Sequence, residues 1–96
     1  MPSYEKMRKN VTFYGTVQGV GFRYRAYHAA QSFGVTGWVR NADDGSVEAE
    51  FEGTSEDISS VIEAIAASRY IYIERIITKI VPLENDRDFR IKDSWY

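Results

Sequence analysis

The spacing of apolar residues changes along the chain and separates strand-like from helix-like segments. Residues 11–17 (VTFYGTV) alternate apolar and polar positions and are rich in β-branched and aromatic residues, which is typical of a strand. From Phe22 onward the apolar residues recur at helical spacing, and Gly34 suits the end of that helix because glycine adopts positive φ readily. The apolar stripe of this expected helix consists of Phe22, Ala26, Ala29, Ala30 and Phe33.

Two further strands are expected at residues 35–41 and 46–52, joined by a tight turn. Asp44 and Gly45 favour a primed hairpin turn, because such a turn needs positive φ. In the second of these strands apolar residues alternate with glutamates, which predicts one buried and one solvated face. The glutamates of the expected solvated face, which are also a candidate cation site, are Glu48, Glu50 and Glu52.

A second helix and two strands complete the pattern. Residues 54–57 (TSED) match a capping box, and the apolar residues that follow have helical spacing. Residues 73–81 form another β-rich run, which Pro82 ends. Phe89 and Ile91 mark a short terminal strand.

The expected order is strand, helix, strand, strand, helix, strand and a short terminal strand. With right-handed crossovers this order predicts an α+β, ferredoxin-like split βαβ sandwich, with both helices on one face of a mainly antiparallel sheet. We therefore expect a single domain over residues 1–96, with residues 1–9 as a mobile N-terminal segment. Ile77 and Val81 are expected either to pack under the terminal strand or to promote self-association.

The composition restricts the chemistry. The 96 residues contain no cysteine and a single histidine, so disulfides, thiolate nucleophiles and cysteine-ligated metals are excluded. That residue, His28, lies off the apolar stripe and is expected to face solvent. A formal net charge of −2 argues against a dedicated nucleic-acid binder, which needs a basic surface. No apolar run approaches the roughly 20 residues of a membrane span. We expect a cytoplasmic protein.

Residues 17–23 (VQGVGFR) are the segment most informative about function. A glycine-rich turn that leads into a helix exposes backbone N–H groups, and the helix dipole adds positive potential there. Arg23, in the first helical turn, adds a guanidinium at the same place. A cation there costs roughly 0.3–1 kcal/mol unless an anion compensates it, which favours an anion site over a tight turn with a solvated arginine. The segment fits neither the nucleotide P-loop nor the GxGxxG pattern.

Asn41 ends the strand that precedes the hairpin. From residue type and spacing alone, an ordinary turn residue is the simpler interpretation and a functional role is the alternative. Four scattered aromatic residues allow a similar choice between a binding surface and side chains without a common role. These residues are Tyr70, Tyr72, Trp95 and Tyr96.

Two motifs resemble the signatures of the acylphosphatase family. They are residues 15–23 (GTVQGVGFR) and residues 37–48 (GWVRNADDGSVE), which fall on the expected loop and the expected hairpin. The resemblance continues to Phe89 and Ile91 and so covers essentially the whole chain. Residues 68–72 (SRYIY) depart from it, because many members carry a Gly-Pro-rich turn there.

The resemblance implies hydrolysis of the carboxyl–phosphate bond of a small-molecule or protein acyl phosphate. Phosphate would be both product and inhibitor, and the chain is expected to act as a monomer without metal, cofactor, covalent intermediate, nucleic acid or membrane. Arg23 and Asn41 match the catalytic pair of the family, and Asn41 would orient the attacking water. The residues that match the phosphate-binding loop are Val17, Gln18, Gly19, Val20, Gly21, Phe22 and Arg23.

A non-catalytic ferredoxin-like module that binds an anion is the alternative function, because this fold hosts many unrelated activities. An RNA-binding version is disfavoured, because residues 46–51 lack the aromatic and basic residues of an RNA-binding strand.

Overall fold

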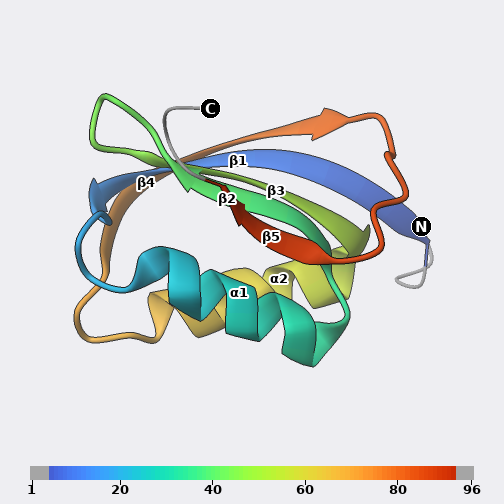
Figure 1. Cartoon of the computed structure of the whole chain (residues 1–96), viewed down its shortest axis with the longest axis horizontal. Helices are drawn as coiled ribbons and strands as arrows, with labels where there is room; N and C mark the ends of the chain where they lie inside the picture. The colour runs from blue at the N-terminus through green and yellow to red at the C-terminus, as the bar shows by residue number, and fades with distance from the viewer. Residues whose placement is uncertain (1–4, 93–96) are drawn as a thin grey trace.

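Two helices and five strands follow one another in the expected order in a computed structural model that describes residues 5–92 (Figure 1). Trp95, Tyr96 and residues 1–4 lie outside the described residues. The elements are β1 (Lys6–Thr16), α1 (Phe22–Phe33), β2 (Thr36–Asn41), β3 (Val47–Thr54), α2 (Ser55–Ala66), β4 (Tyr72–Val81) and β5 (Phe89–Lys92).

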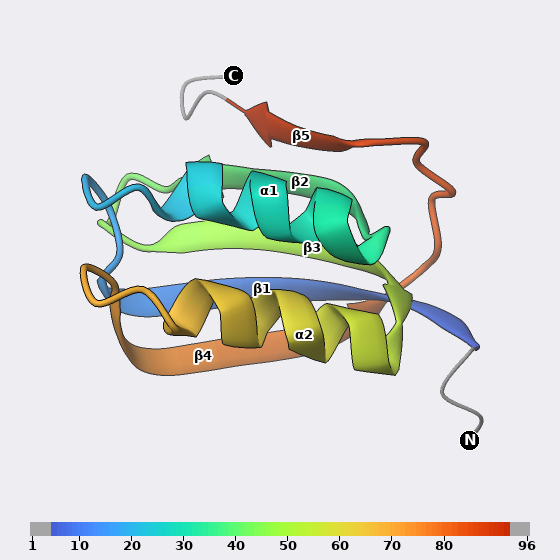
Figure 2. The same ribbon diagram turned by 90° about the horizontal axis from the view of Figure 1, so that it is seen from below.

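The strands form one sheet in the order β4-β1-β3-β2-β5. Every pairing is antiparallel except that of β2 with β5, which is parallel. Both helices cover the same face, with α1 on the β2 side and α2 on the β1 side (Figure 2). The expected ferredoxin-like sandwich is therefore confirmed. Neither helix of the described residues is long and apolar enough to cross a membrane.

Aromatic rings hold the sheet and α1 together. The Phe13 ring of β1 meets the Phe22 ring of α1 with centroids 4.9 Å apart, and it meets Phe51 of β3 at 6.5 Å. Phe51 stacks on Phe89 of β5 at 5.8 Å. Burying an aromatic side chain of this size contributes roughly 1.5–3 kcal/mol. Because Phe22 is the first residue of α1, its burial fixes where that helix begins.

Strand β1 begins at Lys6, whereas the alternation predicted a start at residue 11. It takes in residues 6–9, which belong to the segment expected to be mobile. Polar contacts explain the longer strand, because Arg8 and Asn10 are buried on the face of the sheet opposite the helices and their side chains bond to glutamates of β3. Apolar alternation does not reveal a strand that is held by charge.

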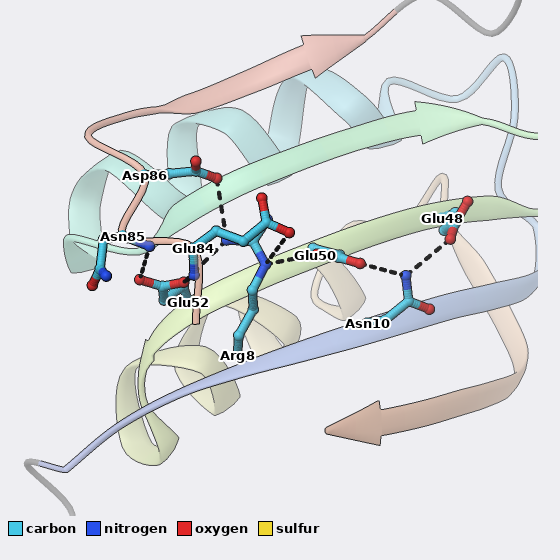
Figure 3. A network of polar contacts seen from close by, with 8 residues as sticks. All are labelled: Arg8, Asn10, Glu48, Glu50, Glu52, Glu84, Asn85 and Asp86. Carbon is cyan, nitrogen blue, oxygen red and sulfur yellow. Dashed lines mark hydrogen bonds and ion pairs between the residues drawn. The ribbon is translucent and has the colours of Figure 1, made fainter. Parts of the chain in front are cut away.

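The glutamates of β3 do not form the solvated face that the sequence predicted. Arg8 is fully buried, and its guanidinium donates from Nε to Glu50 Oε1 at 2.6 Å and from Nη1 to Glu52 Oε1 at 3.1 Å (Figure 3). The expectation failed because the connection between β4 and β5 reaches this face, where Glu84 and Asn85 donate their backbone N–H groups to Glu52.

The expectation that Ile77 and Val81 pack under the terminal strand is wrong. β4 and β5 lie on opposite edges of the sheet, because β5 pairs with β2 rather than with β4. Ile77 is consequently 49% exposed.

Candidate active site

The loop between β1 and α1 brings backbone N–H groups to the start of the helix. Gly19 has φ 75° and Gly21 has φ 79°, a backbone conformation that strains any side chain. The first helical hydrogen bond runs from Arg25 N to Gly21 O at 3.0 Å. The N–H groups of Phe22, Arg23 and Tyr24 precede it and have no acceptor within the helix. They are available to an anion.

The two helices differ at their N-termini. Thr54 Oγ1 caps α2 by accepting from Asp57 N at 3.0 Å, and Glu56 and Asp57 add negative charge to its first turn. At α1 no side chain of the described residues caps the end, and the first turn contains no acid. The positive end of its dipole and the Arg23 guanidinium therefore act in the same place, which favours an anion.

Gln18 joins this loop to the β2–β3 hairpin. Its Nε2 donates to Ala42 O at 2.7 Å and to Ser46 O at 2.9 Å, the two carbonyls at the base of the hairpin. The resemblance placed Gln18 in the phosphate-binding loop. Its side chain points to the hairpin and sets the distance between the loop of Arg23 and the strand of Asn41.

The hairpin is itself fixed by a local side-chain bond. Asp44 Oδ1 accepts from the hydroxyl of Ser46 at 2.6 Å and from its backbone N–H at 3.0 Å. Both bonds hold the pKa of Asp44 below its usual range, and the bond from the Ser46 hydroxyl has the larger effect. Asn41 is the last residue of β2 and pairs with Val47, so the turn holds the end of the strand in place.

Arg23 and Asn41 line one open hollow of about 210 Å³, called here the main hollow. Asn41 lies on the same face of β2 as the buried Val39, which is the face toward the helices, because side chains alternate along a strand. Within residues 5–92, no carboxylate lies at ion-pair distance from Arg23. The main hollow is lined by Val17, Gly19, Gly21, Phe22, Arg23, Tyr24, Asn41 and Ile91.

Sequence reasoning missed two lining residues of the main hollow. Tyr24 follows Arg23 in the first turn of α1, and its position at the start of the helix was the available signal. Ile91 gave no local signal, because it reaches the main hollow through the parallel pairing of β5 with β2.

Other candidate residues lie elsewhere. His28 is exposed, as expected, and its ring contacts those of Tyr24 and Tyr27 at 4.8 Å and 5.4 Å. The guanidinium of Arg40 pairs with Glu48 at 2.6 Å, on the open face of the sheet. Among residues 5–92, no three acidic or histidine side chains are grouped as a metal site requires.

The arrangement suits a tetrahedral, doubly charged group such as a phosphoryl. Backbone N–H groups and a planar guanidinium can bind its oxygens together. The carboxamide of Asn41 can hydrogen-bond a water molecule but cannot remove its proton, because an amide has no useful basicity.

Comparison with known proteins matches both the sequence and the fold. The acylphosphatase family model matches residues 9–91. The acylphosphatase of Thermoplasma volcanium is 41% identical over 85 residues, which cover 88% of this chain and 94% of that protein. The acylphosphatase of Bifidobacterium longum is 38% identical over 89 residues, which cover 90% and 92%. The crystal structure of the Bacillus subtilis acylphosphatase superposes with a TM-score of 0.83 at 34% identity, over 90% of this chain and 98% of that one.

Proposed function

Because this chain belongs to the acylphosphatase family and hydrolyses acyl phosphates to a carboxylate and inorganic phosphate, we propose that the main hollow is where this reaction takes place. One observation carries the proposal: the uncapped N-terminus of α1, Arg23 and Asn41 all border the same space of about 210 Å³. This space holds one phosphoryl group.

The phosphoryl oxygens bind the N–H groups of the first turn of α1 and the guanidinium of Arg23. Phosphoryl transfer through a loose transition state needs mainly positioning and stabilisation of charge on these oxygens. Donors that are already in place provide this without reorganisation during the reaction. Gly19 and Gly21 contribute by allowing the backbone to turn toward the phosphoryl group.

A water molecule held by Asn41 attacks phosphorus in line with the departing carboxylate. The new bond joins the water oxygen to phosphorus, and the electron pair of the broken P–O bond leaves with the acyl oxygen. A carboxylate with a pKa of roughly 4 departs as an anion and needs no general acid. The water proton passes to a phosphate oxygen. Asn41 orients the water and takes no proton itself.

Substitution of Arg23 tests the proposal. Arg23→Ala should lower kcat/KM for acetyl phosphate by roughly 10²- to 10³-fold, since it removes the main charged donor to the transition state. It should also abolish competitive inhibition by inorganic phosphate. Arg90→Ala is the matched control, because Arg90 is an exposed arginine whose neighbour Ile91, rather than itself, lines the main hollow.

If Arg23→Ala kept the wild-type kinetic constants, the reaction would have to take place outside the main hollow, and the proposal would be wrong. Chelators should leave the wild-type rate unchanged, since every step assigned here uses backbone and side-chain donors of the chain itself.

We also propose that the chain forms one domain and works as a monomer in the cytoplasm, without nucleic acid or membrane partners. The outer strand β4 carries Glu74, Arg75 and Lys79, and charges on an edge strand oppose sheet-to-sheet pairing. The absence of cysteine agrees with a reducing compartment. The net charge of −2 disfavours binding to phosphate backbones.

A further inference from the structure

A second hollow, called here the side hollow, opens beside the main hollow. Its volume is about 390 Å³, and it shares Gly21 and Tyr24 with the main hollow. It is lined by residues of the β1–α1 loop, of α1 and of the connection from α2 to β4. That connection and the β1–α1 loop lie at the same end of the molecule (Figure 1). The remaining residues that line the side hollow are Val20, Arg25, His28, Ser68 and Tyr70.

Aromatic rings dominate the side hollow. Tyr24 is 67% exposed and Tyr70 is 64% exposed, so both rings have free faces. The ring of His28 packs against Tyr24 edge to face, with centroids 4.8 Å apart. One exposed tyrosine needs no explanation. Three rings that border the same hollow, next to the site of phosphoryl binding, form a surface suited to another ring.

Tyr70 is held in place by its own turn. Its backbone N–H donates to Ser68 Oγ at 3.2 Å, and Ile71 N donates to Ser68 O at 3.3 Å. The guanidinium of Arg69 lies over the Tyr70 ring at 5.3 Å and donates to its hydroxyl at 3.2 Å. This turn is part of residues 68–72, the stretch that departs from the family pattern.

The direction of the reaction connects the two hollows. In-line displacement puts the attacking water and the leaving group on opposite sides of phosphorus. Asn41, which orients the water, lines the main hollow only, whereas Tyr24 lines both. An acyl group that departs past Tyr24, on the side away from Asn41, enters the side hollow.

We propose that the side hollow binds the acyl group of the substrate, and that Tyr24 and Tyr70 favour an aromatic acyl group over a small aliphatic one. The inference rests on the function proposed above for Arg23 and Asn41. An aromatic ring contacts the free faces of both tyrosines, whereas a methyl group leaves the side hollow empty.

The test compares benzoyl phosphate with acetyl phosphate as substrates. We expect Tyr70→Ala to lower the ratio of their kcat/KM values, benzoyl over acetyl, by roughly 2- to 10-fold, which is the range that aromatic pair energies imply. Tyr70→Phe should keep the wild-type ratio, because it keeps the ring. Tyr72→Ala is the matched control: Tyr72 is 63% exposed, lies two residues further along and does not line the side hollow.

An unchanged ratio in Tyr70→Ala would overturn the inference, even if activity on both substrates fell by the same factor. This result would not affect the proposed function, which depends on the loss of acetyl phosphate hydrolysis in Arg23→Ala. If instead Arg23→Ala hydrolysed acetyl phosphate normally, the proposed function would fail first and the inference with it.

Discussion

At the scale of single residues, Arg8 shows how one buried charge organises distant segments. Its guanidinium reaches Glu50 and Glu52 on β3, and it donates to Asp86 Oδ2 at 3.1 Å in the connection that follows β4 (Figure 3). Its Nη2 is buried without a partner among the described residues. Removal of the Arg8 guanidinium costs about 3–5 kcal/mol, because it leaves the buried carboxylate of Glu52 without its charged partner.

Glu52 gives this cluster a predictable pH dependence. Burial alone would raise the pKa of Glu52, but the backbone N–H of Glu84, the Arg8 guanidinium and the backbone N–H of Asn85 outweigh burial and hold the pKa below its usual range. A carboxylate with a lowered pKa stabilises the fold above its unfolded-state pKa of 4.5, and this contribution is lost as the pH falls below that value.

Glu52→Gln should therefore lower the free energy of unfolding at pH 7 by roughly 1–3 kcal/mol, since it removes charged hydrogen bonds. It should also make the decline of stability between pH 7 and pH 3 shallower than in the wild type. Urea unfolding at several pH values measures both effects. Glu63→Gln, at an exposed glutamate of α2, is the control. Equal slopes for Glu52→Gln and wild type would contradict the assignment.

The resemblance of two motifs to the acylphosphatase signatures predicted Arg23 and Asn41 as a pair, and both residues line the main hollow. The resemblance did not predict that Tyr24 and Ile91 also line it. A motif records which residues recur together, whereas the wall of a hollow depends on which strands become neighbours. The burial of Arg8 was hidden for the same reason, since its partners lie more than 40 residues away in sequence.

At the scale of elements, the two helices divide their roles. α2 has a capped N-terminus with two acids in its first turn, whereas α1 follows Gly21 and has no side-chain cap among the described residues. A side-chain cap stabilises a helix by roughly a few tenths of a kcal/mol relative to a glycine at the same position, so α1, with Gly21 there, forgoes only that small stabilisation. The burial of Phe22 compensates by anchoring α1 to the sheet.

Gln18 links the β1–α1 loop to the β2–β3 hairpin, and its removal should break this link. Gln18→Ala should lower the free energy of unfolding by about 1–2 kcal/mol, since two hydrogen bonds are lost. It should lower kcat by roughly 10- to 100-fold, because Asn41 and the loop of Arg23 lose their fixed separation. Phosphate inhibition should change little.

Steady-state kinetics together with thermal unfolding measure these effects. Gln31→Ala is the control, because among residues 5–92 the Gln31 side chain bonds only to the Tyr27 hydroxyl. A stability loss with normal kcat would show that Gln18 acts on folding alone.

The boundaries of elements were predictable where local signals set them. Gly34 ends α1 with φ 68°, Thr54 caps α2, and β4 stops before Pro82. The signals failed where a strand depends on distant partners. Residues 6–10 join β1 because glutamates of β3 bond to Arg8 and Asn10. The four residues of β5 carry no local signal that predicts its pairing with β2.

At the scale of the whole molecule, the sheet order assembles the site. β1 and β3 lie side by side and β2 follows β3, so the β1–α1 loop and the β2–β3 hairpin meet at one end. The connection from β4 to β5 crosses near the other end and meets the ionic cluster of Arg8 there (Figure 1). The proposed site and the ionic cluster of Arg8 therefore lie at different ends of the same sheet.

We propose that Arg23 binds the phosphoryl group whereas Asn41 positions the water that attacks it. The most direct test is to measure turnover and phosphate affinity together in Asn41→Ala, by initial rates and by calorimetry. Asn85→Gly, at an exposed asparagine with φ 56°, is the control.

We predict that Asn41→Ala loses roughly 10²-fold or more in kcat and binds phosphate within about threefold of the wild type, since a change of that size is under 1 kcal/mol. Arg23→Ala should lose both turnover and phosphate affinity. Normal turnover in Asn41→Ala, or a loss of phosphate affinity as large as that of Arg23→Ala, would contradict this division of roles.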